Sequence, residues 1–298
     1  MPDTKLAVLV DRNVSFIWRR RNLLKIPKFC GEVLPRRCYR IDCFEKVDNS
    51  ETAYWLGMYF SDGCVCQSGR RKLITLCSQD LEILQKLHKF FGLGDNIYSR
   101  IQNEKHVYSL QLCNSRLFDS LVALGCVPRK SNVIEAPKIA SEFFDAFLMG
   151  VFDGDGCISR NSSINSWKAS IGTGSEVFCD WLASILEKKD LSFSIEHKTI
   201  RDKSFYVISL CGVYAKVFLA KLYDSVNADL PLGRKKDRYD LLCQQKLKAP
   251  NYLGWEIEII KKYRDDLEKC VLLLNNDIRN YGWIRSKDSL RHKVKYLH

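Results

Sequence analysis

Apolar residues along this chain recur with the spacing of helices and of strands, and the same order of helix and strand patterns appears twice, about 93 residues apart. The first series predicts a helix ending near 61, strands 64–67 and 73–77, a helix over 81–91, strands 96–102 and 106–113, and a helix over 114–124. The second predicts a helix ending near 154, strands 157–160 and 168–172, a helix over 175–188, strands 193–200 and 204–211, and a helix over 213–223. We therefore expect an α+β fold of two pseudo-symmetric αββαββα halves with antiparallel sheets.

The helix that opens each half carries the most similar stretch of the two series. Residues 52–63 have the sequence TAYWLGMYFSDG and residues 145–156 have DAFLMGVFDGDG. Aligned on Gly57 and Gly150, both stretches place aromatic residues around the glycine and end in Asp-Gly. One such stretch alone is typical of a surface turn after a core helix, whereas two in matched contexts favour a shared function at one place.

Small residues four positions apart mark one face of each of these helices. They are Gly57 and Ser61 in the first half and Gly150 and Gly154 in the second. Small side chains at this spacing let two helix backbones approach closely, so we expect the two helices to pack side by side. Asp62 and Asp155 would then lie near one axis, with Gly63 and Gly156 ending the helices.

Two carboxylates at neighbouring helix C-termini repel each other and the negative ends of the helix dipoles. Divalent cations relieve this repulsion, and oxygen ligands at an open, hydrated site suit Mg²⁺, for which Mn²⁺ can substitute. The expected metal ligands are Asp62 and Asp155, together with the backbone carbonyls of Ser61 and Gly154. A metal held beside a phosphodiester activates water, and two pseudo-symmetric sites suit two antiparallel strands.

The composition indicates a folded, basic chain. Hydrophobic residues make up 46% of it, and the formal net charge of +12 favours a polyanionic partner. Basic residues recur along the whole chain, which fits nucleic acid better than a membrane surface or a merely soluble basic protein. The sequence has no apolar run long enough to span a membrane and no secretory signal, so we expect an intracellular protein, in the cytoplasm, the nucleoid or an organelle.

The thirteen cysteines do not follow the spacing of a metal site. None forms a CxxC pair, and the closest spacing is Cys64-x-Cys66. A disulfide framework is not expected in a chain this long and hydrophobic. We expect most of the cysteines to be reduced and semi-buried.

The two Asp-Gly stretches carry a family resemblance. Residues 55–63 (WLGMYFSDG) and 148–156 (LMGVFDGDG) resemble the nine-residue signature of the LAGLIDADG homing endonucleases, in the two-motif, monomeric type. The first stretch departs from the signature at Phe60 and Ser61, where the family has Asp and Ala. The resemblance covers about residues 45–240.

The resemblance implies a function and assigns residues to it. It implies a site-specific enzyme that makes a double-strand break in a long DNA target by metal-dependent hydrolysis, leaving short 3′ overhangs. It places the metal-binding catalytic role on Asp62 and Asp155, and an assisting role on Lys130 and Lys235. The same fold also serves RNA-splicing maturases and DNA-binding proteins that no longer cleave, and these remain the alternatives. No obligate protein partner is expected.

Double-stranded DNA would lie across a saddle formed by the two sheets, on the faces opposite the core positions. Ser109 and Gln111 alternate with apolar neighbours in one strand, and Lys168 and Ser170 do so in another, although a polar solvent face gives the same pattern. The basic turn at 70–72 suits phosphate contacts. The expected DNA-binding residues are Arg70, Arg71, Lys72, Thr75, Ser109, Gln111, Lys168, Ser170, Lys198, Ser209, Arg285, Lys287 and Arg291.

Four segments are expected along the chain. They are a basic N-terminal extension (1–44), the two halves (45–135 and 136–248) and a C-terminal helical segment (249–298). The extension predicts a helix over 13–25, and the C-terminal segment predicts helices over 255–263, 266–274 and 287–297. The basic end of this segment weakly resembles helix-turn-helix or Myb-like DNA-binding units, although a solvated helix face explains it equally.

Overall fold

The computed structural model describes residues 9–24, 40–93, 97–102, 104–161, 166–200, 202–245, 252–277 and 283–296. The basic residues expected in the N-terminal extension at positions 25, 28, 36 and 37 lie outside the described residues. Within the extension, helix α2 (Val14–Leu23) occupies most of the range in which a helix is predicted. Among the helices of the described segments, none is both long and apolar enough to cross a membrane.

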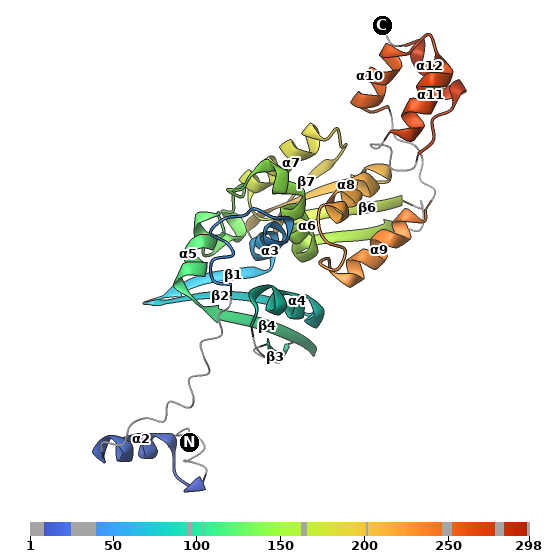
Figure 1. Ribbon diagram of the computed structural model, residues 1–298. Coiled ribbons are helices and arrows are strands. Elements are labelled where there is room, and N and C mark those ends of the chain that lie inside the picture. Colours follow the sequence, from blue (N-terminus) through green and yellow to red (C-terminus); the bar gives the residue numbers. More distant parts are fainter. Residues whose placement is uncertain are drawn as a thin grey trace.

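The two halves have the same order of elements and the same sheet topology (Figure 1). The first half contains α3 (Ser50–Ser61), β1 (Gly63–Ser68), β2 (Arg71–Ser78), α4 (Leu81–Phe91), β3 (Ile97–Gln102), β4 (Lys105–Cys113) and α5 (Ser115–Ala123). The second contains α6 (Phe144–Asp155), β5 (Gly156–Asn161), β6 (Ser166–Thr173), α7 (Glu176–Lys188), β7 (Ser194–Ile200), β8 (Lys203–Cys211) and α8 (Val213–Asp224). The antiparallel sheets have the orders β1-β2-β4-β3 and β5-β6-β8-β7, which confirms the predicted fold class.

The halves differ after their last shared helix. The second half continues into helix α9 (Gly233–Cys243), whereas the first has only a 3-10 turn at Lys130–Asn132. The apolar periodicity does not predict α9, because this helix buries only Lys235 and Leu242.

Alternation along the strands separates a core face from an outer face in each sheet. Ile74 and Leu76 in β2 lie opposite Leu112 and Leu110 in β4, and all four are buried. Helices cover this face, as Figure 1 shows for α4 and α5. The residues that alternate with them therefore point to the opposite side of the sheet.

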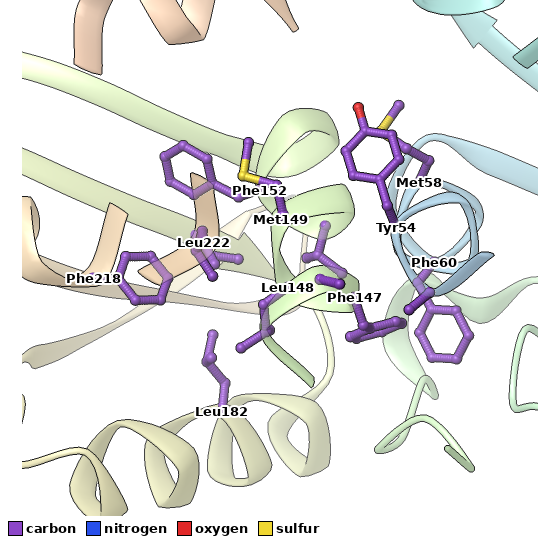
Figure 2. Close-up of a cluster of buried hydrophobic side chains, with 14 of the residues drawn as sticks. Tyr54, Met58, Phe60, Phe147, Leu148, Met149, Phe152, Leu182, Phe218 and Leu222 are labelled. Atoms are coloured by element: carbon purple, nitrogen blue, oxygen red, sulfur yellow. The ribbon is translucent and has the colours of Figure 1, made fainter. Parts of the chain in front are cut away.

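Helices α3 and α6 cross at their glycines. A Cβ added at Gly57 would lie 2.0 Å from the carbonyl oxygen of Phe147, and one added at Gly150 would lie 2.0 Å from that of Tyr54. Backbone therefore packs directly against backbone, as the spacing of the small residues predicts. Figure 2 shows the aromatic side chains that fill the space around this contact, among them Tyr54 and Phe60 of α3 and Phe147 of α6.

Gly63 and Gly156 have a different role from the one expected. Neither ends its helix in the left-handed conformation, and each begins a strand instead. A Cβ at Gly63 would lie 2.5 Å from Cα of Tyr59, and one at Gly156 would lie 2.4 Å from the carbonyl oxygen of Phe152. The glycines are therefore required because the chain turns back against the last turn of its own helix.

The C-terminal segment contains three helices, α10 (Gly254–Lys262), α11 (Leu267–Asn276) and α12 (Lys287–Val294). Their small core encloses an ion pair, in which Arg285 donates to both carboxylate oxygens of Glu256 at 2.7 Å. Trp283 Nε1 donates to the same carboxylate at 3.1 Å. The prediction that Arg285 contacts DNA is therefore wrong, because its side chain pairs with Glu256 and the residue is only 5% exposed.

Candidate active site

The crossing of α3 and α6 brings Asp62 and Asp155 to the same end of the helix pair. Asp62 is the C-cap of α3, and Asp155 is the last residue of α6. A Cβ at Gly154 would lie 2.0 Å from Ser61 Oγ and 3.4 Å from the carboxyl carbon of Asp62. The missing side chain at Gly154 thus lets the two acidic helix ends approach each other.

The surroundings of both carboxylates raise their pKa values. Burial raises the pKa of Asp62, and the charges of Lys235, Lys130 and Arg234 oppose this shift. Burial, followed by the charge of Asp62, raises the pKa of Asp155 to about 6, against the opposing charges of Lys130 and Lys235. The charge that most strongly opposes the rise in the pKa of Asp62 is thus that of Lys235, in the second half. For Asp155 it is that of Lys130, in the first half.

The two predicted lysines lie at this site, buried against the helix ends. Lys130 Nζ donates to the carbonyl oxygens of Ser61 at 2.9 Å and Gly63 at 2.6 Å. The Lys130 ammonium therefore lies at the C-terminal end of α3, where the last carbonyls carry the negative end of the helix dipole.

Lys235 plays the matching part at the end of α6. Its Nζ donates to the carbonyl oxygens of Phe152 at 2.5 Å, Asp153 at 2.7 Å and Gly154 at 3.4 Å. Burial lowers the pKa of Lys235 to about 8. Both carbonyls expected to bind metal, those of Ser61 and Gly154, therefore accept hydrogen bonds from lysine in this structure.

A cleft of about 610 Å³ opens beside Asp62. It is lined by Asp62, Cys77, Ser78, Gln79, Asp80, Val107, Gly154 and Arg234. Arg234 Nε donates to Asp80 Oδ2 at 2.9 Å, which links the start of α9 in the second half to the start of α4 in the first. The cleft therefore contains a basic group and a second carboxylate beside the predicted catalytic aspartate.

Three residues of the site were not expected from the sequence, namely Asp80, Arg234 and Asp153. Asp80 has the sequence context of a helix cap, yet its side chain makes no capping hydrogen bond and turns to Arg234 instead. Asp153 lies in the motif, and its carboxylate is buried between Tyr54 and the backbone of Leu232. Only its position within the second motif could have indicated Asp153 as a site residue from the sequence.

The donor set at the helix ends fits a divalent cation that also binds substrate. Among the described residues, no group of three or more His, Cys, Asp and Glu side chains could enclose a metal. Two carboxylates remain, Asp62 and Asp155, and the charge of Asp62 raises the pKa of Asp155. Mg²⁺ is commonly bound by one or two carboxylates and completed by water and phosphate oxygens, so an open pair of this kind suits it.

The outer faces of the sheets carry most of the predicted DNA-binding side chains. Thr75 lies opposite Gln111 and Cys64 in one row, and Ser170 lies opposite Ser209 and Cys157 in the equivalent row. Ser209 is only 5% exposed, so the prediction that it contacts DNA is wrong, as it is for Arg285. Lys168 and Ser109 share these outer faces, and Arg70 and Arg71 are exposed at the β1–β2 turn. Lys198 is exposed on the edge strand β7, 3.1 Å from Glu196.

Lys72 does not belong to this surface. It has the strand parity of Ile74 and Leu76, so it lies on the helix-covered face of β2. Its ammonium pairs with Asp119 at 2.5 Å and lies over the ring of Phe118. In the C-terminal segment, Lys287 and Arg291 are at the surface and pair with Glu268 and Asp288.

Several cysteines were expected to be semi-buried and are exposed on these outer faces instead. Cys64, Cys66 and Cys113 lie on the outer face of the first sheet, and Cys157 and Cys211 on that of the second. The cysteines that the structure describes are all free. The exposed thiols occupy the alternate strand positions at which polar residues were expected.

Comparisons with known proteins find similarity in structure and none in sequence. No family model matches the chain, and no curated protein matches it. Its structural neighbours are homing endonucleases. The homing endonuclease I-WcaI bound to its DNA recognition sequence aligns with 74% of this chain and 97% of its own, at 14% identity and a TM-score of 0.49.

Two further solved structures are of the same kind. The I-LtrWI LAGLIDADG homing endonuclease bound to target DNA aligns with 79% of this chain and 97% of its own, at 12% identity and a TM-score of 0.41. Mesophilic variants of the homing endonuclease I-DmoI align with 63% of this chain and 98% of theirs, at 11% identity and a TM-score of 0.42. At such identities the alignments describe the backbone, and the chemistry has to be argued from the residues of this chain.

Proposed function

We propose that this protein is a site-specific, monomeric DNA endonuclease that uses a divalent cation, Mg²⁺ in preference, to cut both strands of a duplex. The observation that carries the proposal is the meeting of Asp62 and Asp155 at the α3–α6 crossing, beside two buried lysines. A protein without such chemistry has no reason to bury two acidic groups together, because their repulsion costs stability.

The residues at the helix ends would each have a separate role in hydrolysis. Asp62 and Asp155 would hold the cations, which when bound activate water and stabilise the attacking and leaving oxygens. Lys130 and Lys235 donate to carbonyls at the helix ends and offset the negative ends of the helix dipoles, which leaves the two carboxylates as the anionic groups for a cation. Arg234 lies in the cleft beside Asp62, where a guanidinium suits a phosphate oxygen.

The two sheets supply the surface along which DNA would lie. Their outer faces bear short polar side chains, such as Thr75 and Gln111 in one sheet and Ser170 in the other. Such side chains can read base edges in the major groove, and the net charge of +12 strengthens binding to the backbone. The pseudo-two-fold relation of the halves matches that of the two antiparallel strands. DNA cleavage is also the activity implied by the names of the structural neighbours for those proteins.

Selection from a random duplex library tests this function directly. The purified protein is incubated with the library and Mg²⁺, and cut ends are captured and sequenced. We expect one long sequence family, cut on both strands with a short 3′ overhang. Addition of EDTA should abolish cutting, and Mn²⁺ should restore it.

Two variants provide the controls. Asp62→Asn and Asp155→Asn keep the size of the side chain and remove its charge, so each should abolish double-strand cutting while the selected duplex is still bound. Undiminished cutting by both variants would refute the assignment. Binding without any cutting by the unmodified protein would favour a non-cleaving DNA-binding protein, and selective binding of intron-containing RNA would favour a maturase.

A further inference from the structure

The two sides of the α3–α6 crossing differ in chemistry although the backbones are pseudo-symmetric. Alignment of the two motifs pairs Tyr54 with Phe147 and Phe60 with Asp153. On one side, the hydroxyl of Tyr54 donates to Asp153 Oδ2 at 2.7 Å. On the other, the rings of Phe60 and Phe147 meet edge to face with centroids 4.9 Å apart. Figure 2 shows these two side chains next to each other. The aromatic pair shows that an apolar contact is sufficient to pack the helices at this position.

Asp153 is costly to bury. It is 2% exposed, and Oδ1 has no hydrogen-bond partner, so Oδ2 accepts both of the hydrogen bonds made by this carboxylate. A buried carboxylate with an unpaired oxygen destabilises the fold, whereas the phenylalanine at the matched position does not. Helix packing alone therefore does not account for an aspartate here.

The second hydrogen bond of Asp153 fixes the start of α9. The backbone N–H of Leu232, the residue that precedes the first turn of this helix, donates to Asp153 Oδ2 at 2.8 Å. Lys235 lies in that first turn, and its ammonium donates to the carbonyl oxygens of Phe152 and Asp153. The carboxylate and the backbone carbonyl of Asp153 thus hold both the base of the turn and the lysine that projects from it.

The first half holds the same turn from the other side. Lys86 Nζ donates to the carbonyl oxygens of Leu230 at 3.4 Å and Pro231 at 3.0 Å. The matched lysine of the first half, Lys130, stands instead in a short 3-10 turn after Arg129, which has a φ of +57°. The two active-site lysines are therefore positioned by different structures.

We propose that Asp153 and Tyr54 are positioning residues that hold Lys235 at the site serving one DNA strand, so that the two strands are cut by unequal sites. This inference rests on the proposed function and adds an asymmetry to it.

Strand-resolved cleavage by the full-length protein tests the proposal. The substrate is the duplex that the unmodified protein cuts, labelled separately on each strand. Lys235→Met and Lys130→Met first identify which strand depends on which lysine. Asp153→Leu and Tyr54→Phe should then slow the Lys235-dependent strand by roughly 10- to 100-fold, the usual effect of losing a group that orients a catalytic residue, and leave nicked product.

A conservative variant separates positioning from general damage. Asp153→Asn keeps an oxygen that can accept from both Tyr54 and Leu232, so it should restore most of the rate on that strand. Phe147→Leu, at the matched apolar position, should lower stability without favouring either strand. The proposal would be overturned if Asp153→Leu slowed the cleavage of both strands equally. It would also be overturned if neither Asp153→Leu nor Tyr54→Phe slowed cleavage.

Hydrogen exchange of residues 230–236 provides a measurement that does not require cleavage. These amides should exchange faster in Asp153→Leu than in the unmodified protein or in Asp153→Asn. Unchanged exchange in Asp153→Leu refutes the anchoring of Lys235 whatever the cleavage result. Failure of the unmodified protein to cut any duplex overturns the proposed function, while faster exchange still supports the anchoring.

Discussion

Substitution of Gly150 by alanine tests the close approach of α3 and α6 on which the site depends. The new Cβ would lie 2.0 Å from the carbonyl oxygen of Tyr54 and 2.8 Å from the backbone nitrogen of Met58. Both are backbone atoms of the facing helix, so no side-chain rotation can relieve the contact. Ordinary van der Waals contact begins near 3.4 Å, so the helices must separate by about 1.4 Å at this point.

The size of the effect follows from that displacement. Overpacking a well-packed core typically costs about 1–3 kcal/mol, and here the strain acts on two rigid buried helices. We therefore expect Gly150→Ala to lower the free energy of unfolding by about 3 kcal/mol. The same shift moves Asp62 relative to Asp155, and a misplacement of about 1 Å can lower the rate of an enzyme by about 100-fold.

Urea unfolding and single-turnover cleavage measure the two effects separately. Gly92→Ala is the matched control, because Gly92 has a φ of +69° and a Cβ there meets nothing within 4 Å. This control should cost only about 1 kcal/mol, from the left-handed backbone, and should cut DNA normally. If Gly150→Ala is as stable as the unmodified protein and cuts at the same rate, the backbone-to-backbone crossing is not what positions the carboxylates.

Three other features yield measurable expectations. Glu256→Gln leaves Arg285 buried without its counter-ion, so hydrogen exchange in α10–α12 should accelerate by an amount equivalent to roughly 3–5 kcal/mol, and unchanged exchange would show that the pair contributes little. Burial raises the pKa of Asp153 from 3.8 to about 6, so the folded state binds this proton more tightly than the unfolded state, and stability is lost as the pH rises through this range. The unfolding free energy of Asp153→Asn relative to the unmodified protein should therefore increase by about 2 kcal/mol between pH 4 and 7, whereas a constant difference would contradict this expectation. Alkylation of the exposed thiols should weaken duplex binding at least about tenfold, or about 1.4 kcal/mol. The double variant Cys64→Ser and Cys157→Ser should lose less affinity on alkylation. Unchanged binding after alkylation would show that DNA does not lie on the outer faces of the sheets.

Much of the fold could be predicted because the hydrophobic patterns of helices and strands follow the same order in both halves. Leu110 and Leu112 alternate with polar neighbours in β4, and this alternation correctly separates the core face from the outer face. Helix α9 was missed because it is a surface helix with few buried residues, so its sequence lacks an apolar stripe. The role of Gly63 was misjudged because a glycine after a helix usually serves a left-handed end, whereas this one makes room for Tyr59.

Single charged residues were harder to place than the motif. Lys72 and Arg285 each stand in basic stretches that suit phosphate contacts, yet Asp119 and Glu256, distant in the sequence, pair with them. A long basic side chain can turn towards either face of its element, so charge in the sequence does not show the direction in which it points.

By itself, the sequence determined the two halves, their element order and the pair of aspartates that ends the crossing helices, because hydrophobic period and small-residue spacing are local properties of the chain. The tertiary structure alone decided that Lys130 and Lys235 hold the helix-end carbonyls, that Asp80 meets Arg234, and that Asp153 holds the turn of α9. Each of these contacts joins residues far apart along the chain. Their strength depends on distance and burial after folding, which no local pattern records.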